Sequence, residues 1–265
     1  MTISGTREWS VASQNCWLGC EHRCRYCYAR ANALRFKQIE KAEEWGTTYN
    51  RPAKDVSLAA IAKKRHGGPV MFPTTHDITP GNAQLCLPVL RDLLDQNEVL
   101  IVSKPHASVI EEICDRVGDW HGPRIRERIM FRFTIGAMDA ETLAYWEPGA
   151  PPPAERLYCL AHAFYHGFRT SVSCEPLLTE DYWRLIDAVD PYVTDSIWIG
   201  KLNKLRERVV PGTSAKKIRE IERLQWDKVV QYIYDDLRDH SKIRWKESYK
   251  KVLGLDRPTE PGLDV

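Results

Sequence analysis

Short apolar stretches rich in β-branched and aromatic residues alternate along the chain with segments of helical periodicity. Apolar positions spaced three and four apart predict helices over residues 84–95, 108–117 and 154–166. Strands that alternate with helices indicate βαβ units and a parallel sheet. One weaker strand candidate covers residues 7–12. The five clearer strand candidates span residues 69–75, 98–104, 128–136, 168–175 and 195–201.

Six strand candidates predict an α/β fold of the partial (β/α)6 TIM-like barrel type, although a doubly wound sheet would give a similar pattern. In both architectures, ligands bind at the carboxyl edge of the parallel strands. Polar residues follow the predicted strand ends, as in Thr75-His76-Asp77, Ser103-Lys104 and Cys174-Glu175. We therefore expect a binding site at this edge. The alternative is that the strands simply become polar where they leave the core.

The chain divides into a predicted barrel domain, residues 1–205, and a basic helical extension, residues 206–265. Within the extension we expect a linker at residues 210–214 and a long helix at residues 214–239. A strand at residues 242–245 and a short helix at residues 247–253 should follow. Ser214 is a candidate N-cap for the long helix, because its hydroxyl can accept a backbone N–H of the first turn.

The composition suits a soluble globular protein, with 43% hydrophobic and 28% charged residues among 265. A net charge of +2 does not by itself require a nucleic-acid partner. The charge is uneven, however, since residues 201–251 contain fifteen Lys and Arg against eight Asp and Glu. Such a segment forms either a solvated helical face or a surface that attracts phosphate.

Nothing in the sequence predicts insertion into a membrane or export. There is no run of eighteen apolar residues, and the first fourteen residues lack the apolar stretch of a secretory signal. The eight cysteines then indicate a reducing compartment, where clustered cysteines usually bind metal rather than form disulfides. We expect a cytoplasmic monomer without a membrane partner.

Four of the cysteines, Cys16, Cys20, Cys24 and Cys27, fall within twelve residues, so that one loop can wrap its thiolates around a metal centre. Three interpretations fit this spacing. All four cysteines, or three of them with His22, could form a structural zinc site. Four cysteines could instead hold a closed iron–sulfur cluster for electron transfer. In the third interpretation Cys20, Cys24 and Cys27 bind a four-iron cluster whose remaining iron is open to a substrate or cofactor.

The C-x3-C-x2-C spacing of Cys20, Cys24 and Cys27, with Tyr26 before the last cysteine, resembles the signature of the radical S-adenosylmethionine (SAM) superfamily. The flanking residues 26–30 resemble its spore-photoproduct-lyase-related branch, which includes bacterial and phage proteins. The resemblance covers roughly residues 8–205 and implies a partial (β/α)6 barrel, in agreement with the strand pattern. It also implies an enzyme of the lyase or modification type, with a [4Fe-4S] cluster on the three cysteines and SAM as cofactors.

In this family the open iron of the cluster binds SAM. One electron from the reduced cluster then breaks the sulfur–carbon bond, and the resulting 5′-deoxyadenosyl radical abstracts hydrogen from an unactivated carbon. The protein supplies orientation and a dry cavity for this chemistry. The resemblance therefore also implies an external electron donor, such as flavodoxin or ferredoxin.

The resemblance extends to the predicted strand ends. Residues 74–77 are similar to the branch's Thr-Ser-Asp-type segment beside SAM, and Ser103-Lys104 is similar to its Thr-Lys pair, whose lysine meets the SAM carboxylate. A purely structural pair of Lys104 with Asp77 is the alternative. The SAM-binding residues that the resemblance implies are Tyr26, Tyr28, Thr75, His76, Asp77, Ser103, Lys104, Thr134 and Glu175.

The sequence also departs from the branch. Lyases that repair spore photoproduct carry a cysteine as hydrogen donor where this chain has Thr74, so the same hydrogen-return step is not implied. Cys174 is the candidate catalytic thiol instead, with a buried structural cysteine as the alternative. Cys16 stands where the branch usually has proline, and we expect a packed thiol there rather than a spare ligand.

The substrate is predicted more weakly than the cofactors. Resemblance to a DNA-lesion lyase, together with the basic C-terminal segment, favours a nucleic acid that is repaired or modified. A peptide or a small metabolite is the rival among enzymes. The hypothesis from a different class is a non-catalytic iron–sulfur or zinc-binding module that acts by binding a partner.

Overall fold

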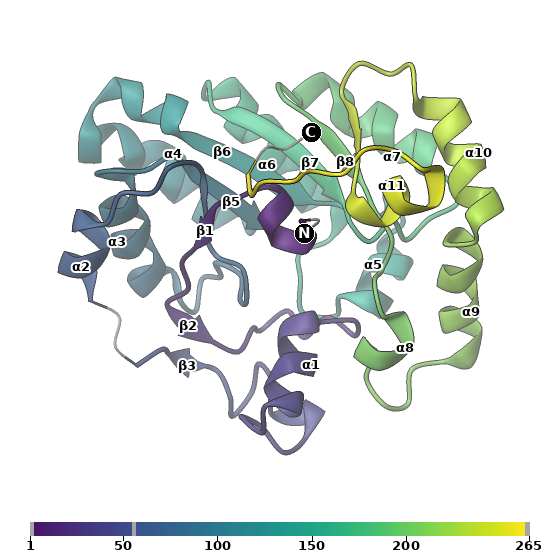
Figure 1. Ribbon diagram of the computed structural model, residues 1–265. Coiled ribbons are helices and arrows are strands. Elements are labelled where there is room, and N and C mark those ends of the chain that lie inside the picture. Colours follow the sequence, from purple (N-terminus) through teal and green to yellow (C-terminus); the bar gives the residue numbers. More distant parts are fainter. Residues whose placement is uncertain (1–2, 55–56, 263–265) are drawn as a thin grey trace.

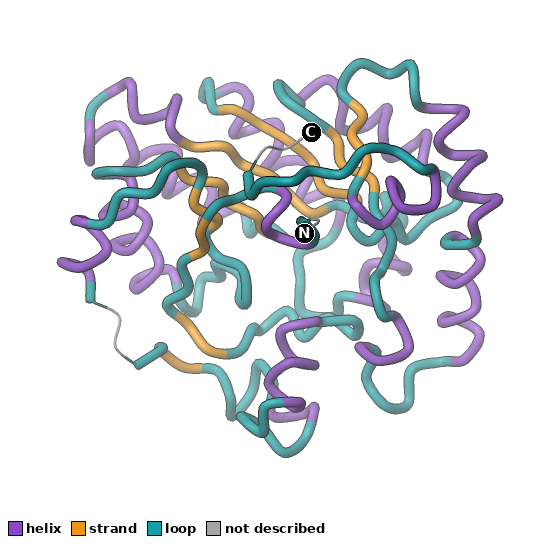
Figure 2. Tube along the Cα trace, viewed as in Figure 1, coloured by secondary structure: helices purple, strands orange, loops and turns teal. Residues whose placement is uncertain are grey.

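A seven-stranded sheet forms the centre of the molecule in the computed structural model, which describes residues 3–54 and 57–262 (Figure 1, Figure 2). The strand order is β1-β4-β5-β6-β7-β8-β9, and every neighbouring pair is parallel. The strands are β1 (Ala12–Ser13), β4 (Val70–Met71), β5 (Val99–Ser103), β6 (Ile129–Thr134), β7 (Arg169–Cys174), β8 (Ile197–Ile199) and β9 (Ile243–Trp245).

The strands follow one another in sequence order without a reversal, which distinguishes this sheet from a doubly wound one. Right-handed crossovers that all proceed in one direction place their helices on a single face, as in a barrel that has not closed. The predicted α/β partial barrel is therefore confirmed.

Helices cover the outer face of the sheet through apolar stripes. In α3 (Ala83–Leu94), for example, Leu87, Leu90 and Leu94 recur at helical spacing and are buried against the sheet. The remaining helices that follow strands of the sheet are α4 (Ala107–His121), α5 (Ala140–Trp146), α6 (Pro153–Tyr165), α7 (Tyr182–Val189), α8 (Leu205–Arg208), α9 (Ala215–Leu224), α10 (Asp227–Leu237) and α11 (Glu247–Leu253). Short 3₁₀ turns occur at η3 (Pro123–Arg128) and η4 (Asp190–Tyr192).

A small substructure follows β1 and lies below the sheet in Figure 1. Strands β2 (Trp17–Leu18) and β3 (Arg51–Pro52) pair antiparallel, and α1 (Tyr28–Arg35) and the turn η2 (Ala42–Glu44) lie between them in sequence. Helix α2 (Leu58–Lys63) leads back to the sheet. The cysteine loop, residues 19–27, connects β2 to α1, so this substructure positions it.

Three predicted strands are much shorter than expected, and one of them, residues 195–201, pairs only over Ile197–Ile199. Of residues 7–12, only Ala12 is in a strand, because the chain first makes the turn η1 (Gly5–Glu8), whose Glu8 is buried in an ion pair with Lys246. Of residues 69–75, only Val70 and Met71 pair with their neighbours. The rest of that segment becomes a loop of the cavity wall.

The predicted long helix over residues 214–239 is wrong, since α9 and α10 are separate helices with Gln225 and Trp226 between them. The reason is that their apolar faces pack on different parts of the molecule. Leu224 of α9 packs with Trp146 of α5, whereas Val230 of α10 belongs to the main core. One continuous helix could not present its apolar side to both.

Strand β9 confirms the strand candidate at residues 242–245 and adds a seventh strand to the sheet. The C-terminal segment thus shares the sheet of the preceding residues, while the domain boundary at residue 205 stays a prediction. None of the helices in the described residues has the length and apolarity needed to cross a bilayer.

Candidate active site

Backbone contacts fix the loop that carries Cys20, Cys24 and Cys27. Cys27 is the N-cap of α1, where its Sγ accepts the backbone N–H of Arg30 at 3.5 Å. The guanidinium of Arg30 donates to the carbonyl oxygen of Cys24 at 2.6 Å. Gly19 has a φ of +85°, and a Cβ there would overlap a neighbouring backbone carbonyl, so the turn into the loop requires glycine.

The three cysteines line a cavity of about 520 Å³ at the carboxyl edge of the sheet. Small-molecule sites usually measure about 300–1,000 Å³, so a nucleotide-sized cofactor fits this volume. The predicted SAM-binding residues come from the loop and from four different strand ends. All of them line this one cavity: Tyr26, Tyr28, Thr75, His76, Asp77, Ser103, Lys104, Thr134 and Glu175.

Asp77 connects the cysteine loop to two strand ends. Its Oδ1 accepts the Ile78 N–H at 2.9 Å and the Ser103 hydroxyl, and its Oδ2 accepts the Lys104 N–H at 2.8 Å. Nδ1 of His22 lies 3.2 Å from Oδ2. Burial alone would raise the pKa of Asp77, but these partners hold it well below its usual range. Its acceptor positions are thus occupied by the protein, which assigns it to positioning rather than to a direct cofactor contact.

Lys104 lies in the cavity wall against a second buried carboxylate. Its Nζ is 3.9 Å from Oε1 of Glu147, which also accepts the Tyr26 hydroxyl, and Oε2 of Glu147 is 2.6 Å from the Arg156 guanidinium. Glu147 and Arg156 are both fully buried. The ion-pair partner of the Lys104 ammonium is therefore Glu147 rather than Asp77. The sequence did not predict Glu147 and Arg156 as site residues.

An amide clamps the loop after β4. Asn15 Oδ1 accepts the N–H groups of Thr74 and Thr75 at 2.8 and 2.9 Å, and its Nδ2 donates to the Thr74 hydroxyl at 2.8 Å. The Tyr28 hydroxyl donates to the Thr74 carbonyl. Burial raises the pKa of Tyr28 to about 12, so it remains a donor at neutral pH. Asn15 precedes the cysteine motif but gave no signal of this role.

Glu175 forms the opposite wall with a buried lysine behind it. Lys246 Nζ lies 3.7 Å from Glu175, 2.9 Å from Glu8 and 3.7 Å from the centre of a Trp9 ring. Burial raises the pKa of Glu175, while the Lys246 ammonium opposes this shift. The carboxylates of Glu8 and Glu175 thus share the ammonium of Lys246.

Cys174 does not line the cavity. Side chains alternate along a strand, so Ser173 and Glu175 face the cavity while Cys174 points to the other side. It is 1% exposed within the apolar core beside Tyr249, and burial raises its pKa to about 12. This placement agrees with the alternative interpretation, in which Cys174 is a buried structural thiol.

Cys16 is also fully buried, as expected for a packed thiol. Its Sγ lies 3.4 Å from Cys86 Sγ and 4.0 Å from His76 Nε2, so it belongs to a group separate from the other three cysteines of the motif. A hydrogen bond from Cys86 lowers the pKa of Cys16 to about 6, and burial opposes this shift.

The spacing of the loop cysteines bears on the choice of metal. Among the described residues, only Cys16, His76 and Cys86 bring three ligand atoms within 4.8 Å of one another. Two thiolates on one tetrahedral zinc are about 3.8 Å apart, given a Zn–S bond of about 2.3 Å. As placed, the Sγ atoms of Cys20, Cys24 and Cys27 do not all lie within 4.8 Å of one another. A cluster whose thiolates bind different iron atoms suits the wider spacing.

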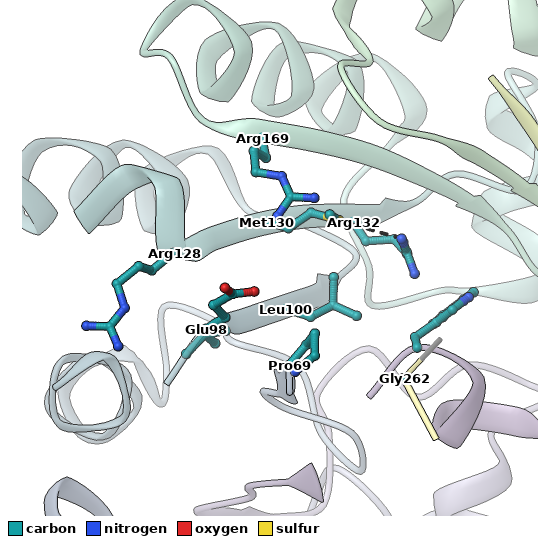
Figure 3. Close-up of a pocket in the computed structure, with 10 residues that line it drawn as sticks. Pro69, Glu98, Leu100, Arg128, Met130, Arg132, Arg169 and Gly262 are labelled. Atoms are coloured by element: carbon teal, nitrogen blue, oxygen red, sulfur yellow. Dashed lines mark hydrogen bonds between the residues drawn. The ribbon is translucent and has the colours of Figure 1, made fainter. Parts of the chain in front are cut away.

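A second, smaller cavity of about 200 Å³ lies at the other ends of the strands. Arg128, Arg132 and Arg169 line it with Glu98 (Figure 3). Trp9 lines both cavities, so this ring lies between them. No cysteine lines the smaller cavity, and the residues predicted to bind SAM all line the larger one.

Comparisons with known proteins show which fold the chain has. In solved structures, spore photoproduct lyase bound to a dinucleoside spore photoproduct superposes with a TM-score of 0.56 and 15% identity, over 92% of this chain and 78% of the lyase. A variant of the same lyase in complex with that ligand gives the same values. The chain has the fold of spore photoproduct lyase.

Sequence comparison adds one relative of unknown function. The uncharacterised protein ORF301 of Acidianus two-tailed virus is 25% identical over 169 residues, which is 60% of this chain. The match spans about half of the viral protein, 54% of its length. No protein-family model matches the chain.

Proposed function

We propose that this chain is a radical SAM enzyme that holds a [4Fe-4S] cluster on Cys20, Cys24 and Cys27. The observation that carries the proposal is that these three thiols line a single cavity together with the polar strand ends. Cys16, the only other cysteine of the motif, contacts Cys86 instead. The cluster thus keeps one iron without a cysteine from this motif.

The cavity residues match the charges of SAM. The cluster and SAM, when bound, supply a carbon radical that removes hydrogen from an unactivated C–H bond. Lys104 offers an ammonium to the carboxylate of SAM, while Glu147 holds it at the wall at 3.9 Å. Tyr26, whose hydroxyl is fixed by Glu147, lies under Lys104 with its ring centre 5.8 Å from Nζ. Apolar Met71 and Val102 help to keep water out of the floor of the cavity.

We further propose a nucleic-acid substrate. Arg7, Lys201 and Arg208 line the cavity on the side of the N-terminal turn and α8, where they can pair with phosphate. The ligand named for spore photoproduct lyase, a dinucleoside photoproduct, is a nucleic-acid lesion, and its fold is the one found here. The electron would come from a donor such as flavodoxin or ferredoxin. The alternative remains a non-catalytic module that binds metal and a partner.

Anaerobic reconstitution with iron and sulfide tests the enzyme proposal. The expected result is uptake of about four irons per chain and formation of 5′-deoxyadenosine when dithionite and SAM are added. Cys24→Ala should abolish both, while Cys114→Ala, which removes a buried thiol in α4, should leave both intact. Uptake of a single zinc ion with no cleavage of SAM would support the non-catalytic module instead.

The substrate proposal has its own readout. Oligonucleotides should raise the rate of deoxyadenosine formation, and the increase should fall steeply between about 50 and 200 mM salt as phosphate contacts weaken. Arg208→Gln and Lys201→Gln should reduce the increase, whereas Lys216→Gln on the outer side of α9 should not. The absence of any response to single- or double-stranded DNA and RNA would exclude nucleic acid and leave a peptide or metabolite.

A further inference from the structure

Cys16, His76 and Cys86 come together from three parts of the chain, beside the cavity that His76 also lines. Cys16 precedes β2, His76 lies in the loop after β4, and Cys86 is in the first turn of α3. The two cysteines are fully buried and His76 is 7% exposed. Their three ligand atoms lie within 4.8 Å of one another. From this arrangement we propose a second metal site, distinct from the cluster, for a single thiophilic ion such as Zn²⁺.

Two of the three distances between ligand atoms are close to those of tetrahedral coordination. On one zinc ion, two thiolates are about 3.8 Å apart, and a thiolate and an imidazole nitrogen are about 3.6 Å apart. The observed distances are 3.4 Å between Cys16 Sγ and Cys86 Sγ, and 4.0 Å between Cys16 Sγ and His76 Nε2. Each lies within about 0.4 Å of the tetrahedral value. A disulfide would require the sulfurs to approach to about 2.05 Å, a much larger change.

The orientation of His76 also suits a ligand. Its Nδ1 lies 3.0 Å from the Asp77 carbonyl oxygen, and a proton donated there leaves the Nε2 lone pair facing Cys16. Histidine ligands usually donate their second N–H in this way, which fixes the tautomer and the ring. At present Nε2 accepts the Cys16 N–H at 3.2 Å, so the metal would take the place of this amide proton. Cys86 Sγ donates to Asn82 Oδ1 at 3.4 Å, a weak hydrogen bond that the metal–sulfur bond would replace once the thiol loses its proton.

Charge balance and access favour the same conclusion. Two thiolates, one neutral imidazole and one divalent cation form a neutral set, which can be buried without leaving an unpaired charge. His76 lines the main cavity, so an ion can reach the site from there. The three protein ligands leave one coordination position for water. Because Cys16 lies four residues before Cys20, the ion would tie the start of the cysteine loop to α3.

Zinc binding by a full-length chain without cluster ligands isolates this site. The background is the triple variant Cys20→Ala, Cys24→Ala, Cys27→Ala. We expect elemental analysis to find one zinc ion per chain of this variant. When Co²⁺ replaces Zn²⁺, the protein should show a sulfur-to-cobalt charge-transfer band. Cys86→Ser in this background should weaken zinc binding by at least about 100-fold, more than loss of a supporting residue does. Cys114→Ser is the matched control, since it also removes a buried thiol and should leave binding unchanged.

His76→Gln tests the same site independently of the cysteine variants, which could lose zinc through misfolding. It removes the imidazole ligand but retains a polar side chain. It should keep the circular dichroism spectrum of the background and lose the cobalt band. Zinc binding that persists in both Cys86→Ser and His76→Gln would overturn the proposal. So would a background protein that binds no zinc, or one in which the two thiols form a disulfide in the presence of zinc.

Discussion

Asp77→Asn removes one charge from a carboxylate that holds three segments together. Asp77 accepts from Ile78, Ser103 and Lys104 and pairs with His22 of the cysteine loop. In asparagine one oxygen becomes an N–H₂ group. The orientation of the amide that costs least places this N–H₂ group where Oδ1 of Asp77 was. The Ser103 hydroxyl then turns to accept a hydrogen bond from the N–H₂ group, and the Ile78 N–H loses its acceptor.

The magnitude follows from these losses. A buried N–H without a partner costs about 1–3 kcal/mol, and hydrogen bonds to a charged group exceed neutral ones by about 1 kcal/mol each. Removing one partner of a buried charge pair typically costs about 3–5 kcal/mol. We therefore expect Asp77→Asn to lower the free energy of unfolding by about 3–5 kcal/mol at pH 7.

The effect should also depend on pH in a defined direction. The pKa of Asp77 is held below its ordinary value in the folded protein. The carboxylate thus stabilises the fold above the unfolded pKa of about 3.9, and this contribution is lost as pH falls toward the folded pKa. The difference between wild type and variant should be largest near neutral pH and should shrink below about pH 4.

Urea unfolding of the cluster-free protein, followed by the fluorescence of its nine tryptophans, measures this directly. Asp239→Asn is the control, because that side chain is 96% exposed and should change stability little. A loss below about 1 kcal/mol at pH 7, combined with weaker SAM binding, would refute the reasoning. It would show that Asp77 contacts the cofactor rather than holding the loops.

Three further predictions test other parts of the site. Glu147→Gln leaves the buried Arg156 charge without its partner and should lower Tm by at least about 6 °C in a calorimetric scan; an unchanged Tm would argue against the pair. Cys174→Ala should leave deoxyadenosine formation and substrate turnover unchanged within about twofold, because this thiol lies outside the cavity, and a selective loss of turnover would restore it as a hydrogen donor. Iron analysis should find an intact cluster in Cys16→Ala and none in Cys24→Ala, and loss in both would contradict the three-ligand assignment.

The sequence predicted the cavity better than the contacts within it. Strand ends in a parallel sheet meet at one edge, so residues as far apart as Thr75 and Glu175 could be assigned to one site from their position after a strand. The ion pairs could not be predicted in the same way. Glu147 and Arg156 lie in a loop and a helix whose approach to Lys104 depends on how the units pack.

The alternation of side chains along a strand bears directly on the prediction for Cys174. Cys174 and Glu175 are neighbours in the strand predicted over residues 168–175, and side chains alternate along a strand, so the two could not both be expected to face the cavity. The structure of the N-terminal segment could not be predicted for a different reason. The turn η1 is stabilised by an ion pair between Glu8 and Lys246. No local pattern in residues 7–12 reveals a partner more than 230 positions away.

The central claim is that three cysteines hold a cluster with one iron left for SAM. Electron paramagnetic resonance of the reduced, reconstituted protein tests it most directly, with spectra recorded before and after addition of SAM. We predict a [4Fe-4S] signal that shifts when SAM binds at the open iron, in the wild type and equally in Cys16→Ala. A cluster signal that SAM leaves unchanged, or one that needs Cys16 to form, would contradict the account.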